Sequence, residues 1–214
     1  MKILGIIGGM SPESTATYYT EINRLVNQKK GGNISAPIVM VSVEFEEIVQ
    51  CQKQSEWQRA GEILAEAGKK LEMIGAEGIV LATNTMHKVA PQIEQAISIP
   101  FLHILDATAG AIKSRGLNKV ALLGTKFTMS DNFYRDGLIV RGITPIVPNE
   151  DTQNEIHRII FDELCVGKFL PQSKAFYLDT IEFLRKQGAE GVILGCTEIG
   201  LLVNQSDFSL PFFD

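Results

Sequence analysis

Two segments of the chain repeat nearly the same sequence. Residues 75–85 read GAEGIVLATNT, and residues 188–198 read GAEGVILGCTE. Each segment starts with a glycine of the kind that ends a helix, continues as a short apolar strand, and closes with small polar residues. Because ligands bind at the carboxyl ends of strands in open parallel sheets, the repeat predicts two half-sites, led by Thr83 and Cys196. One proton-handling group on each side suits chemistry at a carbon that is attacked from both faces.

The repeat extends to the start and the end of each half. Residues 2–8 (KILGIIG) resemble residues 118–124 (NKVALLG), and residues 99–102 (IPFL) resemble residues 210–213 (LPFF). Two halves of about 105 residues each match the usual size of a domain. All doubly wound halves share apolar strands and glycine caps, but this does not explain the shared four-residue sequence Gly-Ala-Glu-Gly.

Strands and helices are expected to alternate along the whole chain. The expected strands lie near residues 2–8, 37–43, 78–83, 100–104, 119–124, 143–147, 191–196 and 210–213. The expected helices lie near residues 14–28, 55–73, 85–97, 107–115, 130–140, 151–166 and 171–186. Strands separated by helices pair in parallel. The predicted fold class is α/β, with two similar doubly wound parallel-sheet domains of the Rossmann type.

The domain boundaries follow from two expected crossings between the halves. The chain first crosses near residues 104–111 and returns across residues 203–210, so that the last strand rejoins the first half. The first domain would comprise residues 1–105 plus 207–214, and the second would comprise residues 106–206. A helix follows the Pro100-Phe101 strand, whereas the matching strand stops at Asp214. We therefore expect a shortened form, or the ordered part, of a longer chain.

Composition argues against several classes of function. A net charge of −5 provides no electrostatic footprint for nucleic acid. No apolar run reaches the length of a membrane span, and Met1 leads into a strand pattern rather than a signal peptide. The three cysteines, Cys51, Cys165 and Cys196, lack metal-ligand spacing and cannot all pair with one another, so we expect no metal and a reducing cytoplasm. The expected partner is a small molecule.

A glycine pair follows the first strand, in the sequence Gly8-Gly9-Met10-Ser11-Pro12. Paired glycines let backbone amides approach a ligand, and the following helix N-terminus favours an anion. The glycine spacing is not that of a dinucleotide-binding loop. A tight strand-to-helix turn with Ser11 as its cap accounts for the same residues equally well.

The first half-site has three polar residues, Thr83, Asn84 and Thr85, followed by Met86 and His87. Hydroxyl and amide groups at a strand end can bind a carboxylate or an ammonium group. Helix capping by Asn84 or Thr85 is the alternative, and this residue class caps helices routinely. His87 is either a base or a residue that orients its neighbours.

The second half-site contains Cys196, in the sequence Gly195-Cys196-Thr197-Glu198. A thiol just before a helix start is expected to have a lowered pKa, because the helix terminus favours the thiolate. Buried cysteines are commonly inert. The position opposite Thr83 in the repeat favours a chemical role for Cys196, whereas Cys51 and Cys165 are interpreted as structural, Cys165 on the buried face of a helix.

Together, Gly8-Gly9-Met10-Ser11, Asn84-Thr85 and Gly195-Cys196-Thr197-Glu198 resemble the aspartate/glutamate racemase family over essentially the whole chain. Residues 83–88 (TNTMHK) are most similar to the branch specific for L-aspartate and L-glutamate. The resemblance implies an active site in the cleft between two α/β domains, a homodimer, and catalysis without pyridoxal phosphate or any other cofactor. It also implies racemisation by two bases, one removing the α-proton and the other delivering a proton to the opposite face.

One residue departs from the pattern of many family members, which carry a cysteine in both half-sites. Here the partner of Cys196 is Thr83. A threonine alkoxide is far harder to form than a thiolate, so Thr83 is expected to donate a proton more readily than it abstracts one. By analogy with the family, Cys196 is the base towards the L-enantiomer, Thr83 delivers the proton that gives the D-enantiomer, and the reverse reaction is slow.

The resemblance also implies a set of substrate-binding residues. These are Met10, Gln52, Asn84, Thr85, Thr125, Lys168, Thr197 and Glu198. Gln52 is expected in a loop that forms a wall of the cleft, and Lys168 could pair with a substrate carboxylate. Two alternatives stay open: an enzyme like arylmalonate decarboxylase, which works with a single cysteine, and a non-catalytic amino-acid-binding protein with an inert Cys196.

Overall fold

Each half of the chain builds its own parallel sheet. The structure is a computed structural model that describes residues 1–214, and it separates into two units, Met1–Ile104 and Leu105–Asp214. The α/β class expected from the sequence is confirmed, because every strand pair in both sheets is parallel. None of the helices is both long enough and apolar enough to cross a membrane.

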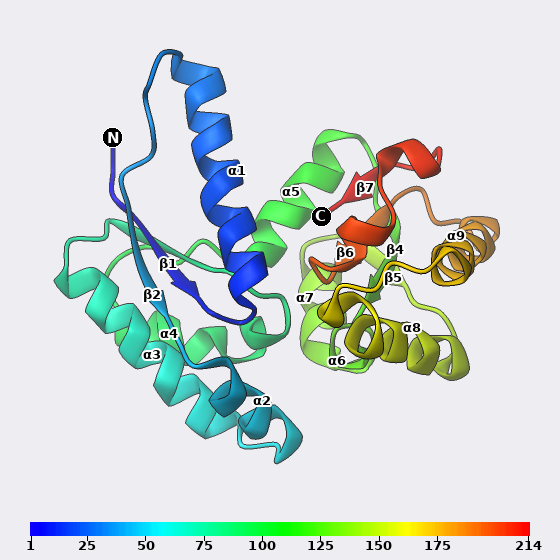
Figure 1. Cartoon of the computed structure of the whole chain (residues 1–214), viewed down its shortest axis with the longest axis horizontal. Helices are drawn as coiled ribbons and strands as arrows, with labels where there is room; N and C mark the ends of the chain where they lie inside the picture. Colours follow the sequence, from blue (N-terminus) through cyan, green and yellow to red (C-terminus); the bar gives the residue numbers. More distant parts are fainter. The chain divides into compact units, whose positions relative to one another are not determined.

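The first unit contains a three-stranded sheet with the order β2-β1-β3. Its elements are β1 (Leu4–Gly8), α1 (Pro12–Lys30), β2 (Ile38–Ser42), α2 (Phe45–Lys53), α3 (Trp57–Met73), β3 (Gly78–Leu81), the 3-10 helix η1 (Thr85–Val89) and α4 (Ala90–Ala96). Helix α3 packs on β1, β2 and α4, as Figure 1 shows. Ile7, Leu64, Leu71 and Ile79 are fully buried at this contact and form the centre of the apolar core.

The second unit contains a four-stranded sheet with the order β5-β4-β6-β7. Its elements are α5 (Ile104–Ser114), β4 (Lys119–Gly124), α6 (Lys126–Ser130), α7 (Asn132–Val140), β5 (Thr144–Ile146), α8 (Glu150–Asp162), η2 (Leu164–Val166), α9 (Pro171–Lys186), β6 (Val192–Gly195), α10 (Ile199–Leu202), η3 (Gln205–Asp207) and β7 (Phe212–Phe213). Helices α8 and α9 lie on one side of the strands and α7 on the other (Figure 1). The apolar residues of α8 and α9 meet Leu123 and Leu194 in one buried cluster.

The repeated Gly-Ala-Glu-Gly sequence has the same structural role in both units. Gly75 and Gly188 have φ of +96° and +97°, a conformation that L side chains rarely adopt. The Glu77 carboxylate accepts the backbone N–H of Ile3 at 2.9 Å, and the Glu190 carboxylate accepts that of Lys119 at 3.1 Å. In each half, the glutamate lies just before one strand, β3 or β6. Its carboxylate therefore holds the start of the first strand of the same sheet, β1 or β4, beside it.

The final strand corrects the predicted domain boundaries. Residues 207–214 were expected to rejoin the first half, but β7 pairs in parallel with β6 of the second unit. Val192 donates its N–H to the Pro211 carbonyl at 2.9 Å, just as Ile79 donates to the Pro100 carbonyl at 2.9 Å. Phe101 forms only an isolated bridge to Ile79 rather than the expected strand over residues 100–104. The repeat therefore places each Pro-Phe segment in its own half.

The other differences between the predicted and the observed elements concern helices. Helices α2, α6 and α10 were not predicted, because short amphipathic segments between strands have no strong periodic signal. The helix expected over residues 85–97 is divided into η1 and α4, with Pro91 in the first turn of α4. Helix α1 begins two residues earlier than expected, because the Ser11 side chain accepts the backbone N–H of Ser14 and so caps it.

Candidate active site

In the first unit, the register of the sheet brings the glycine turn next to the polar segment. Ile7 of β1 pairs with Leu81 of β3, and the Ala82 N–H donates to the Ile7 carbonyl at 2.9 Å. The two chain segments that leave these strands, Gly8–Met10 and Ala82–Thr83, therefore start side by side at the carboxyl edge of the sheet. This is the edge at which the sequence analysis placed the first half-site.

The glycine pair is explained by packing within the turn. A Cβ at Gly8 would overlap the Thr15 side chain, and a Cβ at Gly9, whose φ is +96°, would overlap the Val43 carbonyl. The Gly9 N–H donates to Thr15 Oγ1 at 2.8 Å. Met10 is buried in the apolar core. The tight turn is thus the structural reason for the glycines, and the Gly9 amide is already used within the protein.

His87 holds the backbone of Thr83. Its Nε2 accepts the Ile104 N–H at 3.2 Å, so the proton resides on Nδ1, which donates to the Thr83 carbonyl oxygen at 2.7 Å. Burial, with a contribution from the nearby His103 ring, lowers the pKa of His87 to about 3. His87 is therefore a neutral residue with both nitrogens occupied, which favours the orienting role over the role of a base.

The other residues of this half-site either follow Thr83 in the chain or contact the segment that follows it. Asn84 stands before η1 and makes no side-chain capping hydrogen bond, and Thr85 is the first residue of η1; both are half-buried. Gln52 lies in helix α2 rather than in the expected loop, and its Nε2 donates to Met86 Sδ at 3.1 Å. The structure therefore brings Gln52 against the segment that follows Thr83.

In the second unit, the same arrangement recurs at β4 and β6. Gly124 pairs with Gly195, so Thr125 and Cys196 leave neighbouring strands at the same level. A Cβ at Gly124 would lie 3.0 Å from the Gly195 carbonyl, which explains the glycines at this close approach. Thr125 is buried and caps α6, because its hydroxyl accepts the Thr128 N–H at 3.3 Å.

The environment of Cys196 contradicts the expected thiolate. The Cys196 S–H donates to Glu198 Oε2 at 2.9 Å. Burial, the charge of Glu198 and this hydrogen bond raise the pKa of the thiol well above its usual range. Helix α10 has only four residues, so its terminus does not offset the neighbouring carboxylate. Cys196 is a protonated thiol at neutral pH, and Glu198 is its hydrogen-bond acceptor.

The remaining predicted residues differ in their exposure to solvent. Thr197 is half-buried beside Cys196, whereas Lys168 is exposed in the turn after η2. Cys51 is buried in α2, as expected for a structural cysteine. Cys165 is exposed in η2, so the expectation that it lies on a buried helix face is wrong.

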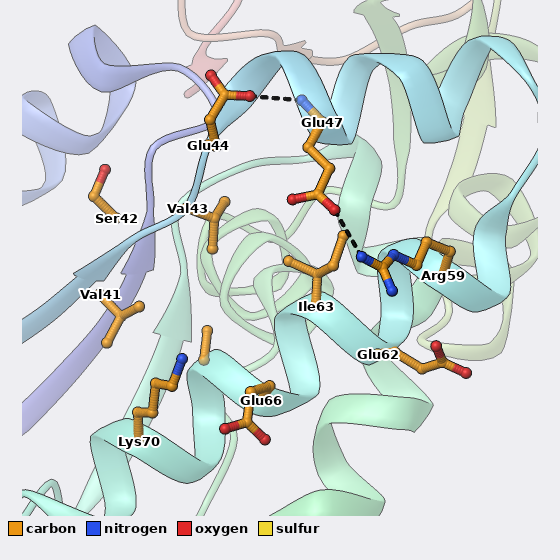
Figure 2. A pocket seen from close by; sticks show the side chains of 11 residues that line it. Val41, Ser42, Val43, Glu44, Glu47, Arg59, Glu62, Ile63, Glu66 and Lys70 are labelled. Carbon is orange, nitrogen blue, oxygen red and sulfur yellow. Dashed lines mark hydrogen bonds and ion pairs between the residues drawn. The ribbon is translucent and has the colours of Figure 1, made fainter.

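A cavity of about 400 Å³ lies elsewhere in the first unit, between β2 and helices α2 and α3 (Figure 2). Glu44 caps α2 by accepting the Glu47 N–H at 2.7 Å, and Glu47 pairs with Arg59 at 3.0 Å. The cavity contains none of the predicted site residues, and these carboxylates already have partners. No group of three or more His, Cys, Asp and Glu side chains is placed to hold a metal ion.

The contacts of His87 with Thr83 and of Glu198 with Cys196 were not predicted from the sequence. The sequence pattern leaves the role of His87 open, and the family resemblance implies only a substrate-binding role for Glu198. The spacing of four between Thr83 and His87, within one helical turn, was the available signal for the first. No pattern indicated that Glu198 would turn back to the thiol two residues before it.

This chain is similar to known proteins over its whole length. The sequence profile of the Asp/Glu/Hydantoin racemase family matches residues 7–214. A crystal structure of a Yersinia pestis chain assigned to the Asp/Glu racemases is 50% identical, covers 100% of this chain and 94% of that chain, and has a TM-score of 0.95. An aspartate racemase homologue from Pyrococcus horikoshii is 40% identical, covers 100% and 93%, and has a TM-score of 0.87.

The same fold also serves other relatives. The broad specificity amino-acid racemase RacX of Bacillus subtilis is 23% identical over 99% of this chain and 92% of its own length. Arylmalonate decarboxylase, at 13% identity and a TM-score of 0.56 over 99% of this chain and 86% of that one, shares the fold alone. The family profile spans both half-sites, including the segments that carry Thr83 and Cys196. This chain therefore belongs to the Asp/Glu/hydantoin racemase family.

Proposed function

We propose that the protein racemises aspartate, glutamate or both without a cofactor. Cys196 takes the α-proton from the L-enantiomer, and Thr83 delivers a proton to the opposite face of the same carbon. The proposal requires a substrate within reach of the carboxyl edges of both sheets. Asn84, Thr85 and Thr197 stand beside the two proton-handling residues in the sequence and are the proposed contacts for its polar groups.

The observation that carries the proposal is the hydrogen bond from Cys196 to Glu198. Loss of the thiol proton to solvent would put two negative charges within 2.9 Å of each other. Transfer of that proton to Glu198 leaves a single negative charge on the pair. A thiol with a raised pKa can thus become a base through its own neighbour.

The proton steps then balance. The Cys196 proton passes to Glu198, and the sulfur's electron pair takes the α-hydrogen, leaving the electrons of the C–H bond on the α-carbon. The Thr83 hydroxyl gives its proton to the opposite face of that carbon, and water reprotonates the resulting alkoxide. The Glu198 carboxylic acid then gives its proton to the hydroxide that remains, which restores the carboxylate. The Thr83 carbonyl bond to His87 keeps this residue in place.

Racemisation in D₂O tests the proposal. Each enantiomer of aspartate and glutamate is supplied to the wild type and to Cys196→Ser, and α-deuterium and chirality are followed together. We expect L-substrate to give D-product carrying deuterium, with Cys196→Ser slower by at least a factor of about 10³. Activity that survives Cys196→Ser would contradict the assignment of the base.

A decarboxylase with a single cysteine is the second candidate, since that fold is shared and Cys196 has no cysteine partner in the first half-site. An arylmalonate is supplied to the same wild-type preparation. Release of carbon dioxide from it, with no deuterium entering any amino acid, would favour the decarboxylase. A Cys196 that resists alkylation, in a protein that binds amino acids without turnover, would favour a binding protein.

We also propose an oligomeric state and a cellular compartment for the enzyme. Three cysteines that form no disulfide agree with a reducing cytoplasm. We propose in addition that the enzyme is a homodimer with a small amino acid as its partner. Sedimentation velocity at micromolar concentration measures the oligomeric state directly.

A further inference from the structure

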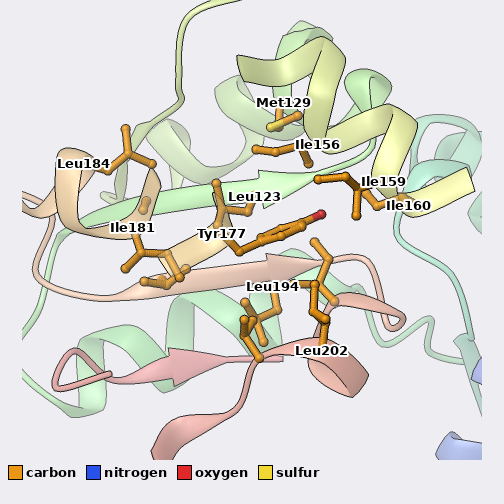
Figure 3. Close-up of a cluster of buried hydrophobic side chains, with 14 of the residues drawn as sticks. Leu123, Met129, Ile156, Ile159, Ile160, Tyr177, Ile181, Leu184, Leu194 and Leu202 are labelled. Atoms are coloured by element: carbon orange, nitrogen blue, oxygen red, sulfur yellow. The ribbon is translucent and has the colours of Figure 1, made fainter. Parts of the chain in front are cut away.

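Tyr177 of helix α9 carries a buried hydroxyl with no hydrogen-bond partner. The side chain is fully buried among apolar residues of α8, β4 and β6, including Leu123, Ile159 and Leu194 (Figure 3). Buried tyrosine hydroxyls usually find a partner, and an unsatisfied one costs about 1 to 3 kcal/mol. Phenylalanine would fill the same space without that cost.

The hydroxyl points towards the candidate site of its own unit. In Figure 3 the ring lies along β4 and β6, with its oxygen directed to the ends at which the strand arrows point. Cys196 is the first residue after β6 and packs against the same cluster. Burial, with contributions from the ionised form of Cys196 and from Glu163, raises the pKa of the phenol, so Tyr177 stays a hydrogen-bond donor.

The other charged groups nearby are already engaged. Glu163 accepts hydrogen bonds from Ser173 and, at 2.9 Å, from Arg158. Glu198 accepts the Cys196 thiol. The groups that act electrostatically on Cys196 or Tyr177 are Glu155, Glu163, Cys165 and Glu198. None of them becomes a stronger acceptor during the proposed reaction, whereas the sulfur of Cys196 does.

We propose that Tyr177 is a positioning residue that donates a hydrogen bond to the Cys196 sulfur once that sulfur has become a thiolate. The inference rests on the proposed role of Cys196 as a base. Tyr177 keeps its own proton, while the thiol proton goes to Glu198. Hydrogen bonds to charged acceptors are about twice as strong as neutral ones, so the hydroxyl favours the thiolate over the thiol. Its lack of a partner in the resting protein is thus used during turnover.

The test compares wild type with Tyr177→Phe, which removes a single oxygen atom. Thr180→Val is the matched control, because it removes another buried hydroxyl of α9 that donates only to the Phe176 carbonyl. Alkylation of Cys196 by iodoacetamide is measured as a function of pH by mass spectrometry. Trypsin cleaves after Lys186 and leaves one peptide, residues 187–214, with Cys196 as its single cysteine.

For Tyr177→Phe we expect the alkylation midpoint of Cys196 to rise by about one pH unit and kcat to fall about tenfold, with KM unchanged. The melting temperature stays equal or rises, and Thr180→Val leaves the midpoint in place. An unchanged midpoint in Tyr177→Phe would overturn the inference. Alkylation is measured without substrate. A shifted midpoint in a protein that does not racemise amino acids would therefore contradict the proposed function but not the contact between Tyr177 and Cys196.

Discussion

The Cys196 thiol and the Glu198 carboxylate form a hydrogen-bonded pair, with 2.9 Å between Sγ and Oε2. The two residues are separated by Thr197 alone and follow strand β6, whose four residues are all buried. The sequence predicted an isolated thiolate favoured by a helix terminus, whereas the structure shows a thiol that is hydrogen-bonded to a carboxylate. The proposed base is therefore neutral at rest and would ionise through Glu198.

Glu198→Gln is expected to make Cys196 more reactive towards alkylation and to make turnover slower. Removing the carboxylate removes a charge that raises the Cys196 pKa, so alkylation at pH 8 becomes faster. Turnover of L-substrate falls by at least about tenfold, because the thiol loses its proton acceptor. Glu182→Gln, on the surface of α9, is the control for loss of one carboxylate. A fall in both alkylation and turnover would mean that Glu198 mainly supports the local fold.

Thr83→Cys should increase turnover of the D-enantiomer. A thiol reaches its ionised state far more readily than an alcohol, so cysteine can abstract a proton where threonine mainly donates one. Initial rates from both enantiomers are compared with those of Thr83→Val, which keeps the shape and removes the hydroxyl. Thr83→Val is expected to lose at least about 90% of the L-to-D rate. Equal rates from both enantiomers in wild type would show that Thr83 is not a weak base.

Acid should destabilise the protein through His87. Its folded-state pKa of about 3 lies below the value of 6.5 for the unfolded chain, so the unfolded state binds more protons between these values. The contribution of His87 is present above pH 6.5 and is lost as the pH falls towards 3, by at most about 1.4 kcal/mol per pH unit. Urea unfolding at pH 7 and pH 4.5 measures this loss. His87→Asn, which keeps a donor near the Thr83 carbonyl, should be less stable at pH 7 and less sensitive to acid; an equal sensitivity would contradict this assignment.

Gly9→Ala should damage the turn that precedes α1. The added Cβ would overlap the Val43 carbonyl in a backbone with φ of +96°, and we expect a loss of more than about 2 kcal/mol in unfolding free energy. Gly31→Ala is the matched control, because Gly31 also has a positive φ but an added Cβ there would meet no atom within 4 Å. That control is expected to lose about 1 kcal/mol. Similar losses in both variants would show that the backbone conformation, and not the Val43 contact, sets the effect.

The α/β class, the internal repeat and the two strand ends that carry Thr83 and Cys196 could all be predicted from the sequence. These features depend on local patterns: apolar strands, glycines after helices, and polar residues where a buried strand stops. The duplicated Pro-Phe segments also contained the correct assignment of the last strand, since each segment pairs within its own half. The expectation of a return to the first half did not use that symmetry.

The protonation of Cys196 and the contacts of His87 could not be predicted before the chain was folded. The Cys196 pKa depends on burial and on the direction of the Glu198 side chain, neither of which follows from residue spacing. His87 is excluded as a ready base because both of its nitrogens meet backbone groups, one of them 17 residues away along the chain. The free Tyr177 hydroxyl is visible only once α9 is packed on the sheet. Electrostatic environments are sums over groups that folding brings together, and a linear sequence does not contain those distances.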